Sequence, residues 1–364
     1  MRILYDGTIY KLQTAGGINR YFSHLIEGLP KSYYPIVTTT GCSEISQPQH
    51  PNLKLIYYHR FGLPPNRLSY FLEPYFFRWF TDLKKVDLLH PTYYQNLNQQ
   101  DFQLFRMPLV ITVHDMIHEL FQPTVDPNLK QIAAKKSAIF AANAIICVSE
   151  NTKKDLIKIY PQVREKIKVI PLASSLDQSL VTPDLTLPPQ PYYLYVGGRW
   201  IYKNFDGLLK AFAQITKRHH DVSLCVVGES FSPTELKEIN TLGISDRIYS
   251  YHSLNNHQLA SLYHGSLALV YPSQYEGFGL PPLEAMSCAT AVLATNTSSI
   301  PEVTGDAALL LNPNEVSEWV DGMLWLLHHP IERDRLIAKG KKRAQQFSWE
   351  KTVNQTVAVY QSLV

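Results

Sequence analysis

Short apolar runs that alternate with amphipathic helical segments constrain the fold of this chain more than any other feature. In the first half, strands are expected at residues 2–5, 35–40, 53–59, 87–90, 109–114, 144–149 and 166–172. In the second half, strands are expected at residues 192–196, 223–228, 247–251, 267–271, 291–295 and 307–311. Such alternation is typical of mainly parallel sheets covered by helices. It therefore predicts an α/β fold with the same plan in both halves.

The length of 364 residues exceeds what one hydrophobic core usually supports, so two domains are expected. The segment DLTLPPQP at residues 184–191 contains three prolines and is predicted to link residues 1–183 to residues 192–347. Residues 348–364 are predicted to form a last helix that returns to the first domain. Other helices are expected at residues 18–29, 129–142, 205–215, 315–328 and 331–346, and Asn151-Thr152 is expected to cap a helix that begins near Lys153.

Composition excludes several classes of protein. With 45% hydrophobic and 18% charged residues, the chain is expected to be globular rather than disordered. A formal net charge of +3 without a dense Lys/Arg tract does not indicate nucleic-acid binding. The four cysteines form no CxxC pair and are expected in a reducing compartment. No apolar run reaches the roughly 18 residues of a membrane span. We therefore expect a cytoplasmic protein, at most peripheral at the inner membrane face.

Residues 67–85, RLSYFLEPYFFRWFTDLKK, are unusually aromatic, and basic residues lie near both ends. The segment could be an interfacial membrane helix. Because Pro74 interrupts it and its aromatic residues fall on more than one face, the sequence favours a helix packed against the sheet or lining an acceptor cleft.

Two carboxylates flank a glycine-rich turn at residues 270–286, VYPSQYEGFGLPPLEAM. Glu276 lies between an expected strand and helix, and Glu284 lies near the start of that helix. The N–H groups around Gly277, Phe278 and Gly279, together with the helix start, could bind an anion. Acidic residues near a helix start also commonly offset the helix dipole. The turn alone therefore leaves a structural and a functional interpretation open.

Other polar residues are expected at the carboxyl ends of strands, where parallel α/β sheets bind ligands. Gly16-Gly17 follows the first strand, although paired glycines are as often a flexible connector, and the GxGxxG pattern of dinucleotide sites is absent. His114 follows the strand at 109–114, and Arg199 and Lys203 follow the strand at 192–196. Singly, these could be a core histidine and surface cations. Together, they indicate a cleft site for a diphosphate and sugar hydroxyls.

With these residues placed, the chain resembles the retaining glycosyltransferases of family 4, which have the GT-B fold of two Rossmann-like domains facing across a cleft. The resemblance is carried by an E-x7-E pattern from Glu276 to Glu284 and by further motifs in the same order as in the family. These are GGINRY, TVHD, VSE, YVGGRWIYKN, SIPEVTGDAALLLNP and FSWEKT. It implies a nucleotide-sugar donor bound by the second domain, an acceptor bound by the first, and a last helix that crosses back.

The resemblance also implies roles for individual residues. Arg199 and Lys203 would hold the donor diphosphate, with Gly16 and the N–H of Gly17. Glu284 would accept hydrogen bonds from the ribose. Glu276 would hold the transferred sugar, together with the turn formed by Gly277, Phe278, Gly279 and Leu280. His114 would lie near the reacting side of the sugar. The family usually needs no divalent metal, and this chain has no Asp-x-Asp motif. Ala289 and Ala291 depart from the glycine and proline common in the family.

The expected activity is retaining transfer of a hexosyl unit, with the departing phosphate taking the acceptor proton. The branch with GGINRY and YKN favours GDP-mannose as the donor and a polysaccharide or lipid-linked saccharide as the acceptor. Two alternatives remain at this point. A sugar-nucleotide epimerase shares the two-domain fold, and a catalytically silent sugar-nucleotide-binding protein would have the same donor residues.

Overall fold

The computed structural model describes residues 1–13, 16–40, 48–62, 66–83, 85–182, 187–188 and 191–364, except for the side chains of 81–83. The chain divides into two compact units. Unit 1 comprises Met1–Leu172 and Trp349–Val364, and unit 2 comprises Ala173–Ser348. Most of the predicted linker at 184–191 lies outside the described residues, so the linker remains a prediction.

Unit 1 contains parallel strands at all the positions that the sequence predicts. They are β1 (Arg2–Asp6), β2 (Tyr34–Thr39), β3 (Lys54–Tyr57), β4 (Leu88–Leu89), β5 (Val110–Val113), β6 (Ala144–Cys147) and β7 (Ile167–Val169). The orders are β3-β2-β1-β4 and β5-β6-β7, and a parallel bridge between Leu89 and Leu109 joins the two groups. Strands covered on both faces consist of continuous apolar runs, and Ile3 and Val110 are accordingly fully buried.

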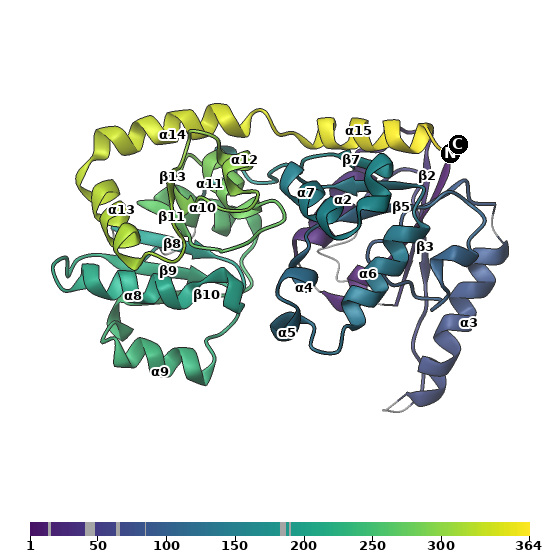
Figure 1. Ribbon diagram of the computed structural model, residues 1–364, viewed down its shortest axis with the longest axis horizontal. Coiled ribbons are helices and arrows are strands. Elements are labelled where there is room, and N and C mark those ends of the chain that lie inside the picture. Colours follow the sequence, from purple (N-terminus) through teal and green to yellow (C-terminus); the bar gives the residue numbers. More distant parts are fainter. Residues whose placement is uncertain (14–15, 41–47, 63–65, 84, 183–186, 189–190) are drawn as a thin grey trace. The chain divides into compact units, whose positions relative to one another are not determined.

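The helices of unit 1 flank this sheet (Figure 1). They are α1 (Thr8–Leu12), α2 (Gly17–Glu27), α3 (Arg67–Leu83), α4 (Ile117–Leu120), α5 (Gln122–Val125), α6 (Lys130–Ala141), α7 (Glu150–Ile159) and α15 (Trp349–Gln361). The predicted cap at Asn151-Thr152 is wrong. Helix α7 begins at Glu150, because the Ser149 hydroxyl accepts from the Thr152 N–H at 2.9 Å and so ends the strand earlier than expected.

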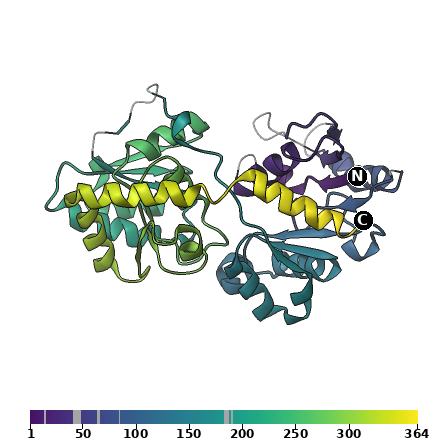
Figure 2. The same ribbon diagram turned by 90° about the horizontal axis from the view of Figure 1, so that it is seen from above.

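The returning helix α15 packs on unit 1, as predicted. The Thr352 hydroxyl donates to the Pro171 carbonyl at 2.7 Å, and the Tyr360 hydroxyl lies 2.6 Å from Nδ1 of His90. The Trp349 ring stacks on His24 with the ring centres 4.6 Å apart. Figure 2 shows the two chain ends together in this unit.

Unit 2 repeats the plan with strands β8 (Tyr192–Val196), β9 (Ser223–Val227), β10 (Ile248–Tyr251), β11 (Ala268–Tyr271), β12 (Val292–Thr295) and β13 (Leu309–Leu311). Their order is β10-β9-β8-β11-β12-β13, and every pair is parallel. The chain therefore winds outwards in both directions from the pair β8 and β11. In doubly wound sheets, ligands bind beyond the carboxyl ends of the strands at this switch point.

Helices cover both faces of the second sheet. They are α8 (Phe205–Thr216), α9 (Pro233–Thr241), α10 (Asn256–Gly265), α11 (Leu280–Ser287), α12 (Ile300–Thr304), α13 (Val316–His328) and α14 (Pro330–Ala344). One core includes Tyr193, Leu208 and Trp319, and the other includes Leu194, Met286 and Val292. Short 3₁₀ helices lie at Phe102–Leu104, Pro161–Lys166, Gln178–Leu180, Ile201–Lys203 and Ser245–Arg247. Among the described residues, no helix is both long enough and apolar enough to cross a bilayer.

Candidate functional site

Two loops meet at the switch point of unit 2, and they carry most of the predicted donor site. One follows β8 and includes Arg199 and Lys203, and the other follows β11 and includes Glu276. The Gln274 N–H donates to the Tyr202 carbonyl at 2.8 Å, which joins the two loops. The Thr297 hydroxyl donates to the Gln274 carbonyl at 2.8 Å and adds the loop after β12. The site is thus built on loops that hold one another in place.

Lys203 and Glu276 form an ion pair at this point. Nζ of Lys203 lies 2.6 Å from Oε1 of Glu276, and the two side chains are only 15% and 10% exposed. The Tyr271 hydroxyl donates to the same Oε1 at 2.6 Å. Burial and the nearby Glu276 carboxylate raise the pKa of Tyr271 well above its ordinary value, so the phenol stays protonated. Both of these contacts are made by Oε1, and a carboxylate can accept further hydrogen bonds through its second oxygen.

Serines of the next loop fix the glycine-rich turn. The Glu276 N–H donates to the Ser298 hydroxyl at 2.9 Å. The Ser299 hydroxyl lies 2.9 Å from the Glu276 carbonyl and 2.8 Å from the Phe278 carbonyl. Gly279 has φ +101°, and a Cβ there would lie 2.5 Å from Cδ1 of Ile300. Only glycine fits this backbone without strain.

The turn presents a short row of backbone N–H donors. Within the described part of the chain, no acceptor faces the N–H groups of Phe278, Gly279 and Leu280. Helix α11 begins at Leu280, and the prolines 281 and 282 have no N–H to offer. The expectation that the helix start adds several donors is therefore corrected: the N–H groups available to a ligand belong mainly to the turn itself.

The second carboxylate of the E-x7-E pattern lies on α11. Glu284 is 4% exposed, and Oε2 accepts from the Tyr263 hydroxyl at 2.9 Å. Tyr263 lies on α10, which packs against α11. The carboxylate is therefore oriented by a neighbouring helix, and it does not share the Lys203 ammonium.

Arg199, which the resemblance predicts to hold the donor diphosphate, forms an ion pair with Glu235 in the structure. Nε of Arg199 lies 2.5 Å from Oε1 of Glu235, and another guanidinium nitrogen donates to the Ser230 carbonyl at 2.9 Å. Burial opposes ionisation of Glu235, but the hydrogen bond from Arg199 lowers its pKa below the ordinary value. The guanidinium also lies 4.9 Å from the centre of the Phe231 ring. The structure thus pairs Lys203 with Glu276 and ties Arg199 to α9.

The predicted glycine pair of unit 1 lies at the start of α2. Gly16 precedes the helix in an extended conformation, and the exposed Gly17 is its first residue. The Asn19 side chain donates to the Gln13 carbonyl at 2.9 Å. Helix α2 has eleven residues, and the binding of an anion at its start stays a prediction.

His114 follows β5 in unit 1, as predicted. Its N–H donates to the Tyr94 hydroxyl at 3.3 Å, and its ring packs edge-on against Tyr21 at 5.3 Å. Burial and the nearby Lys135 lower its pKa to about 4, although Asp115 opposes this shift. The imidazole is therefore neutral near pH 7. Its Nε2 is buried and has no hydrogen-bond partner among the described residues, which suits a substrate hydroxyl.

Several residues that support the site are absent from the sequence prediction. Tyr271, Tyr263 and Glu235 orient the predicted charged groups, and Ser298 and Ser299 hold the turn. Ser299 begins the SIPEVTG motif and Tyr271 lies in the 270–286 stretch, so a sequence signal existed for these two residues. Among the described residues, no group of three or more His, Cys, Asp or Glu side chains is arranged to hold a metal ion.

Comparisons with known families cover almost the whole chain. Residues 15–178 match the Glycosyltransferase Family 4 model, and residues 183–343 match Glycosyl transferases group 1. The chain is 32% identical over 270 residues to the O-antigen chain mannosyltransferase B of Escherichia coli, with 70% of each chain covered. It is 32% identical over 225 residues to the MMP alpha-(1->4)-mannosyltransferase of Mycolicibacterium hassiacum, covering 60% of this chain and 54% of that protein.

Solved structures show the same fold. Sucrose-phosphate synthase from Thermosynechococcus elongatus has a TM-score of 0.77 at 23% identity, over 100% of this chain and 98% of that one. Anabaena HepE, in complex with UDP and glucose, has a TM-score of 0.78 at 18% identity, over 100% and 99% of the two chains. Together with the motif order and the two Rossmann-like units, these matches identify the chain as a retaining glycosyltransferase of family 4 with the GT-B fold.

Proposed function

We propose that the enzyme transfers a hexosyl unit, mannose being favoured, from a nucleoside diphosphate sugar to a saccharide or lipid-linked saccharide in cell-surface polysaccharide synthesis. The observation that carries the proposal is the Lys203–Glu276–Tyr271 group beside the N–H donors of the glycine-rich turn. The names of the relatives support mannose, because two of them at 32% identity are mannosyltransferases. GDP-mannose is the favoured donor.

The geometry of unit 2 suits the two chemical parts of such a donor. The diphosphate would lie against Lys203 and the N–H groups of Phe278, Gly279 and Leu280, since charge-assisted hydrogen bonds to phosphate are strong. The sugar would place hydroxyls on Oε2 of Glu276, and the ribose would bind Glu284. The positive start of α11 adds to the field at the diphosphate.

Lys203 is a better candidate than Arg199 for the main phosphate contact. Lys203 is paired with Glu276, which itself belongs to the proposed site. Arg199 is instead held by Glu235 and the Ser230 carbonyl. One terminal nitrogen of Arg199 is buried without a partner among the described residues. We propose that Arg199 binds the diphosphate through this nitrogen while Glu235 keeps its hydrogen bond to Nε.

In the proposed transfer, negative charge develops on the departing phosphate as the bond between it and the sugar breaks. Lys203 and the backbone N–H groups stabilise that charge without reorganising, which lowers the barrier. The leaving phosphate takes the acceptor proton, so no protein carboxylate is needed as a nucleophile. His114, neutral near pH 7, would hold a hydroxyl of the transferred sugar through Nε2.

Turnover of Lys203→Ala and Glu276→Ala tests the proposal. Each substitution should lower transfer from GDP-mannose by about a hundredfold or more, as loss of one electrostatic donor does elsewhere. Lys339→Ala is a matched control, because Lys339 pairs with Asp306 at 2.8 Å on the exposed surface. Proton NMR of the product should show retention of the anomeric configuration.

Specific outcomes would overturn the proposal. An unchanged transfer rate in Lys203→Ala or Glu276→Ala would show that this ion pair has no role in the reaction. Conversion of the nucleotide sugar without any acceptor indicates an epimerase, and donor binding without turnover indicates a silent binding protein. A thermal-shift panel of GDP-, UDP- and dTDP-sugars identifies the base of the donor. If UDP-glucose alone raised the melting temperature, UDP-glucose rather than GDP-mannose would be the donor.

A further inference from the structure

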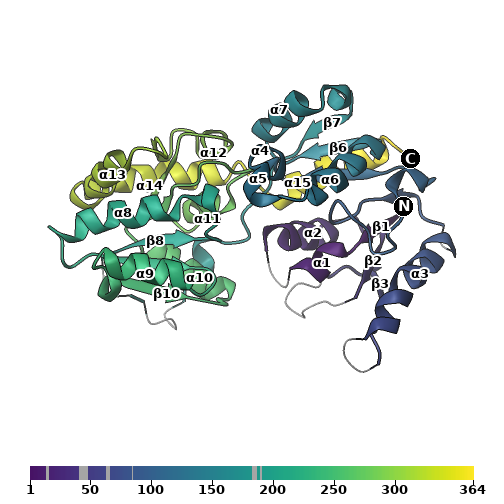
Figure 3. The same cartoon turned by 60° about the horizontal axis from the view of Figure 1, so that its bottom comes forward.

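Helix α3 of unit 1 has two apolar faces, and only one of them belongs to the core. Phe77 is 1% exposed, and the partly buried Phe76 and Phe80 pack with it on the core of unit 1. Figure 3 shows α3 beside β3 at the edge of the sheet. The sequence interpretation of a helix packed on the sheet therefore describes this face.

The opposite face of α3 exposes large apolar side chains along its length. The exposed fractions are 62% for Leu68, 63% for Phe71, 37% for Leu72, 54% for Tyr75 and 59% for Trp79. Because spacings of three and four place residues on one side of a helix, these five form a continuous stripe, which we call the aromatic face. Exposed apolar patches of this kind mark interaction surfaces.

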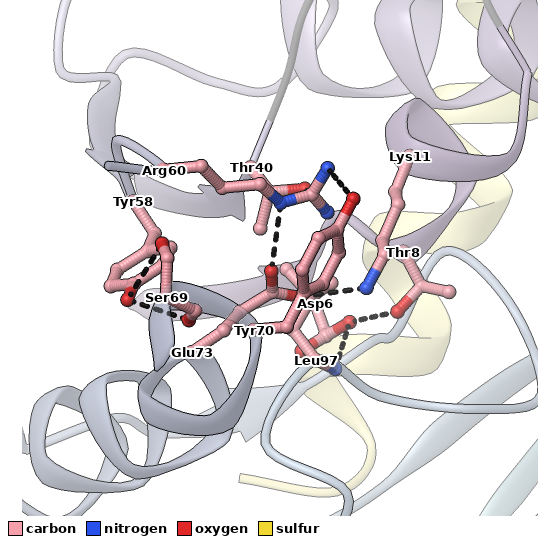
Figure 4. A network of polar contacts seen from close by, with 10 residues as sticks. All are labelled: Asp6, Thr8, Lys11, Thr40, Tyr58, Arg60, Ser69, Tyr70, Glu73 and Leu97. Atoms are coloured by element: carbon pink, nitrogen blue, oxygen red, sulfur yellow. Dashed lines mark hydrogen bonds and ion pairs between the residues drawn. The ribbon is translucent and has the colours of Figure 1, made fainter. Parts of the chain in front are cut away.

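Ion pairs of the buried Glu73 fix this helix to unit 1 and so hold the aromatic face outwards. Glu73, 2% exposed, lies 2.7 Å from Nζ of Lys11 on α1 and 3.1 Å from Nε of Arg60 after β3. Ser69, on the same side, lies 3.1 Å from the Phe61 N–H and 3.3 Å from the Tyr58 hydroxyl. Figure 4 shows Lys11 and Arg60 converging on Glu73 from separate elements. The helix thus presents a fixed surface.

The sequence segment that contains the aromatic face is positively charged. Residues 60–85 contain five basic and two acidic residues, so this segment has a formal charge of +3, equal to that of the whole chain. Arg67 is exposed, and the Arg78 guanidinium lies 5.6 Å from the centre of the Tyr75 ring. The Arg60 guanidinium lies 4.4 Å from the centre of the Tyr70 ring. The buried Glu73 is paired with Arg60 and also with Lys11, which lies outside this segment and adds a further positive charge.

We propose that the aromatic face of α3 binds the surface of an anionic lipid bilayer, with the helix lying in the plane of the headgroups. Tryptophan, tyrosine and phenylalanine prefer this interfacial layer, and flanking arginines attract anionic headgroups. A second copy of the chain would bring two positive segments together, so charge favours the lipid surface. The inference is independent of the proposed donor and acceptor.

Vesicle flotation tests the proposal with the full chain. The protein should bind vesicles of phosphatidylcholine with phosphatidylglycerol more tightly than vesicles of phosphatidylcholine alone, and added salt should reduce the difference. The triple variant Phe71→Ser, Tyr75→Ser, Trp79→Ser should lose about a hundredfold in binding. Arg67→Ser should lose about fivefold, and only on anionic vesicles. Leu104→Ser with Ile331→Ser is the control, because both side chains are 69% exposed outside α3.

Tryptophan quenching supplies a test that needs no loss of binding. Trp79 and Trp200 are the most exposed tryptophans among the described residues, at 59% and 67%. Brominated lipid should quench the wild-type and Trp200→Phe fluorescence, and Trp79→Phe should remove most of this quenching. Quenching that survives Trp79→Phe would overturn the proposal. Unchanged vesicle binding by the triple variant, or no vesicle binding by the wild type, would also overturn it. A wild-type dimer that is lost only in the triple variant would show that the aromatic face binds a second copy of the chain instead.

Discussion

Gly279→Ala should destabilise unit 2 and weaken donor binding through the backbone alone. Gly279 precedes α11 with φ +101°, a conformation that L-residues rarely adopt. An added Cβ would also lie 2.5 Å from Cδ1 of Ile300, which is fully buried. The substitution therefore combines two separable penalties, and it removes no functional side chain.

The two penalties have different sizes. The left-handed conformation costs an L-residue about 1–2 kcal/mol. Forcing a methyl group into a packed core costs about 1–3 kcal/mol. Loss of glycine's freedom in the unfolded chain offsets about 0.4–1 kcal/mol of this. The net destabilisation should be about 1–5 kcal/mol, or roughly 2–20 °C in the melting temperature of a unit of this size.

Scanning calorimetry with two further substitutions separates the penalties. Gly243→Ala is the matched control, because Gly243 has φ +68° and no atom lies within 4 Å of the position that an added Cβ would take. It should cost only about 1 kcal/mol. Ile300→Val removes Cδ1, so Gly279→Ala in that background should also cost only about 1 kcal/mol. Titration calorimetry with GDP-mannose should show weaker binding for Gly279→Ala than for Gly243→Ala.

Equal destabilisation by Gly279→Ala and Gly243→Ala would refute the steric part of this reasoning. A Gly279→Ala variant with wild-type donor affinity would refute the role of the turn N–H groups. If Ile300→Val failed to reduce the cost, the contact with Ile300 would not be the source of the strain.

Three other perturbations address single interactions. Tyr271→Phe removes the donor 2.6 Å from Oε1 of Glu276, so kcat/KM should fall about tenfold with the circular dichroism spectrum unchanged; an unchanged kcat/KM would contradict the role of this bond. Lys135→Met leaves Glu119, 5% exposed, without its partner at 2.8 Å and should cost about 3–5 kcal/mol in urea unfolding, most of it recovered by adding Glu119→Leu. Burial lowers the pKa of His90 from its ordinary value near 6.5 to about 3 in the folded state. Between these two pH values the unfolded chain binds a proton that the folded chain does not, so the free energy of unfolding decreases as the pH falls from 6.5 towards 3. Urea unfolding between pH 4 and 6.5 should therefore depend less on pH for His90→Asn than for wild type, by about 1.4 kcal/mol per pH unit, and identical slopes would contradict the neutral histidine.

The strands and most helices could be predicted from the sequence because burial on both faces leaves continuous apolar runs. The runs at 109–114 and 267–271 correspond to β5 and β11, and the period of three and four at 18–29 corresponds to α2. The start of α7 could not be predicted in the same way because Ser149 lies in the same apolar run as β6, and only its hydrogen bond to Thr152 shows that the helix has begun.

Partners across the sheet could not be predicted. Arg199 and Lys203 are four residues apart in one loop, yet Arg199 pairs with Glu235 on α9 and Lys203 pairs with Glu276 after β11. The two faces of α3 posed a related problem, because its aromatic residues surround the helix and the sequence does not show which face the sheet covers. Buried Glu73 settles this, since its ion pairs orient the helix.

The contacts of Glu276 bear on two uses of a carboxylate in a retaining enzyme. To act as a nucleophile, Oε1 would have to give up both the Lys203 ammonium and the Tyr271 hydroxyl, each 2.6 Å away. Oε2 can instead accept a hydrogen bond from a sugar hydroxyl while those two donors stay in place. Glu284 likewise accepts a hydrogen bond, from the Tyr263 hydroxyl. The arrangement therefore suits the proposed recognition of hydroxyls by both carboxylates, and it agrees with the proposal that Lys203 and the turn N–H groups stabilise the departing phosphate.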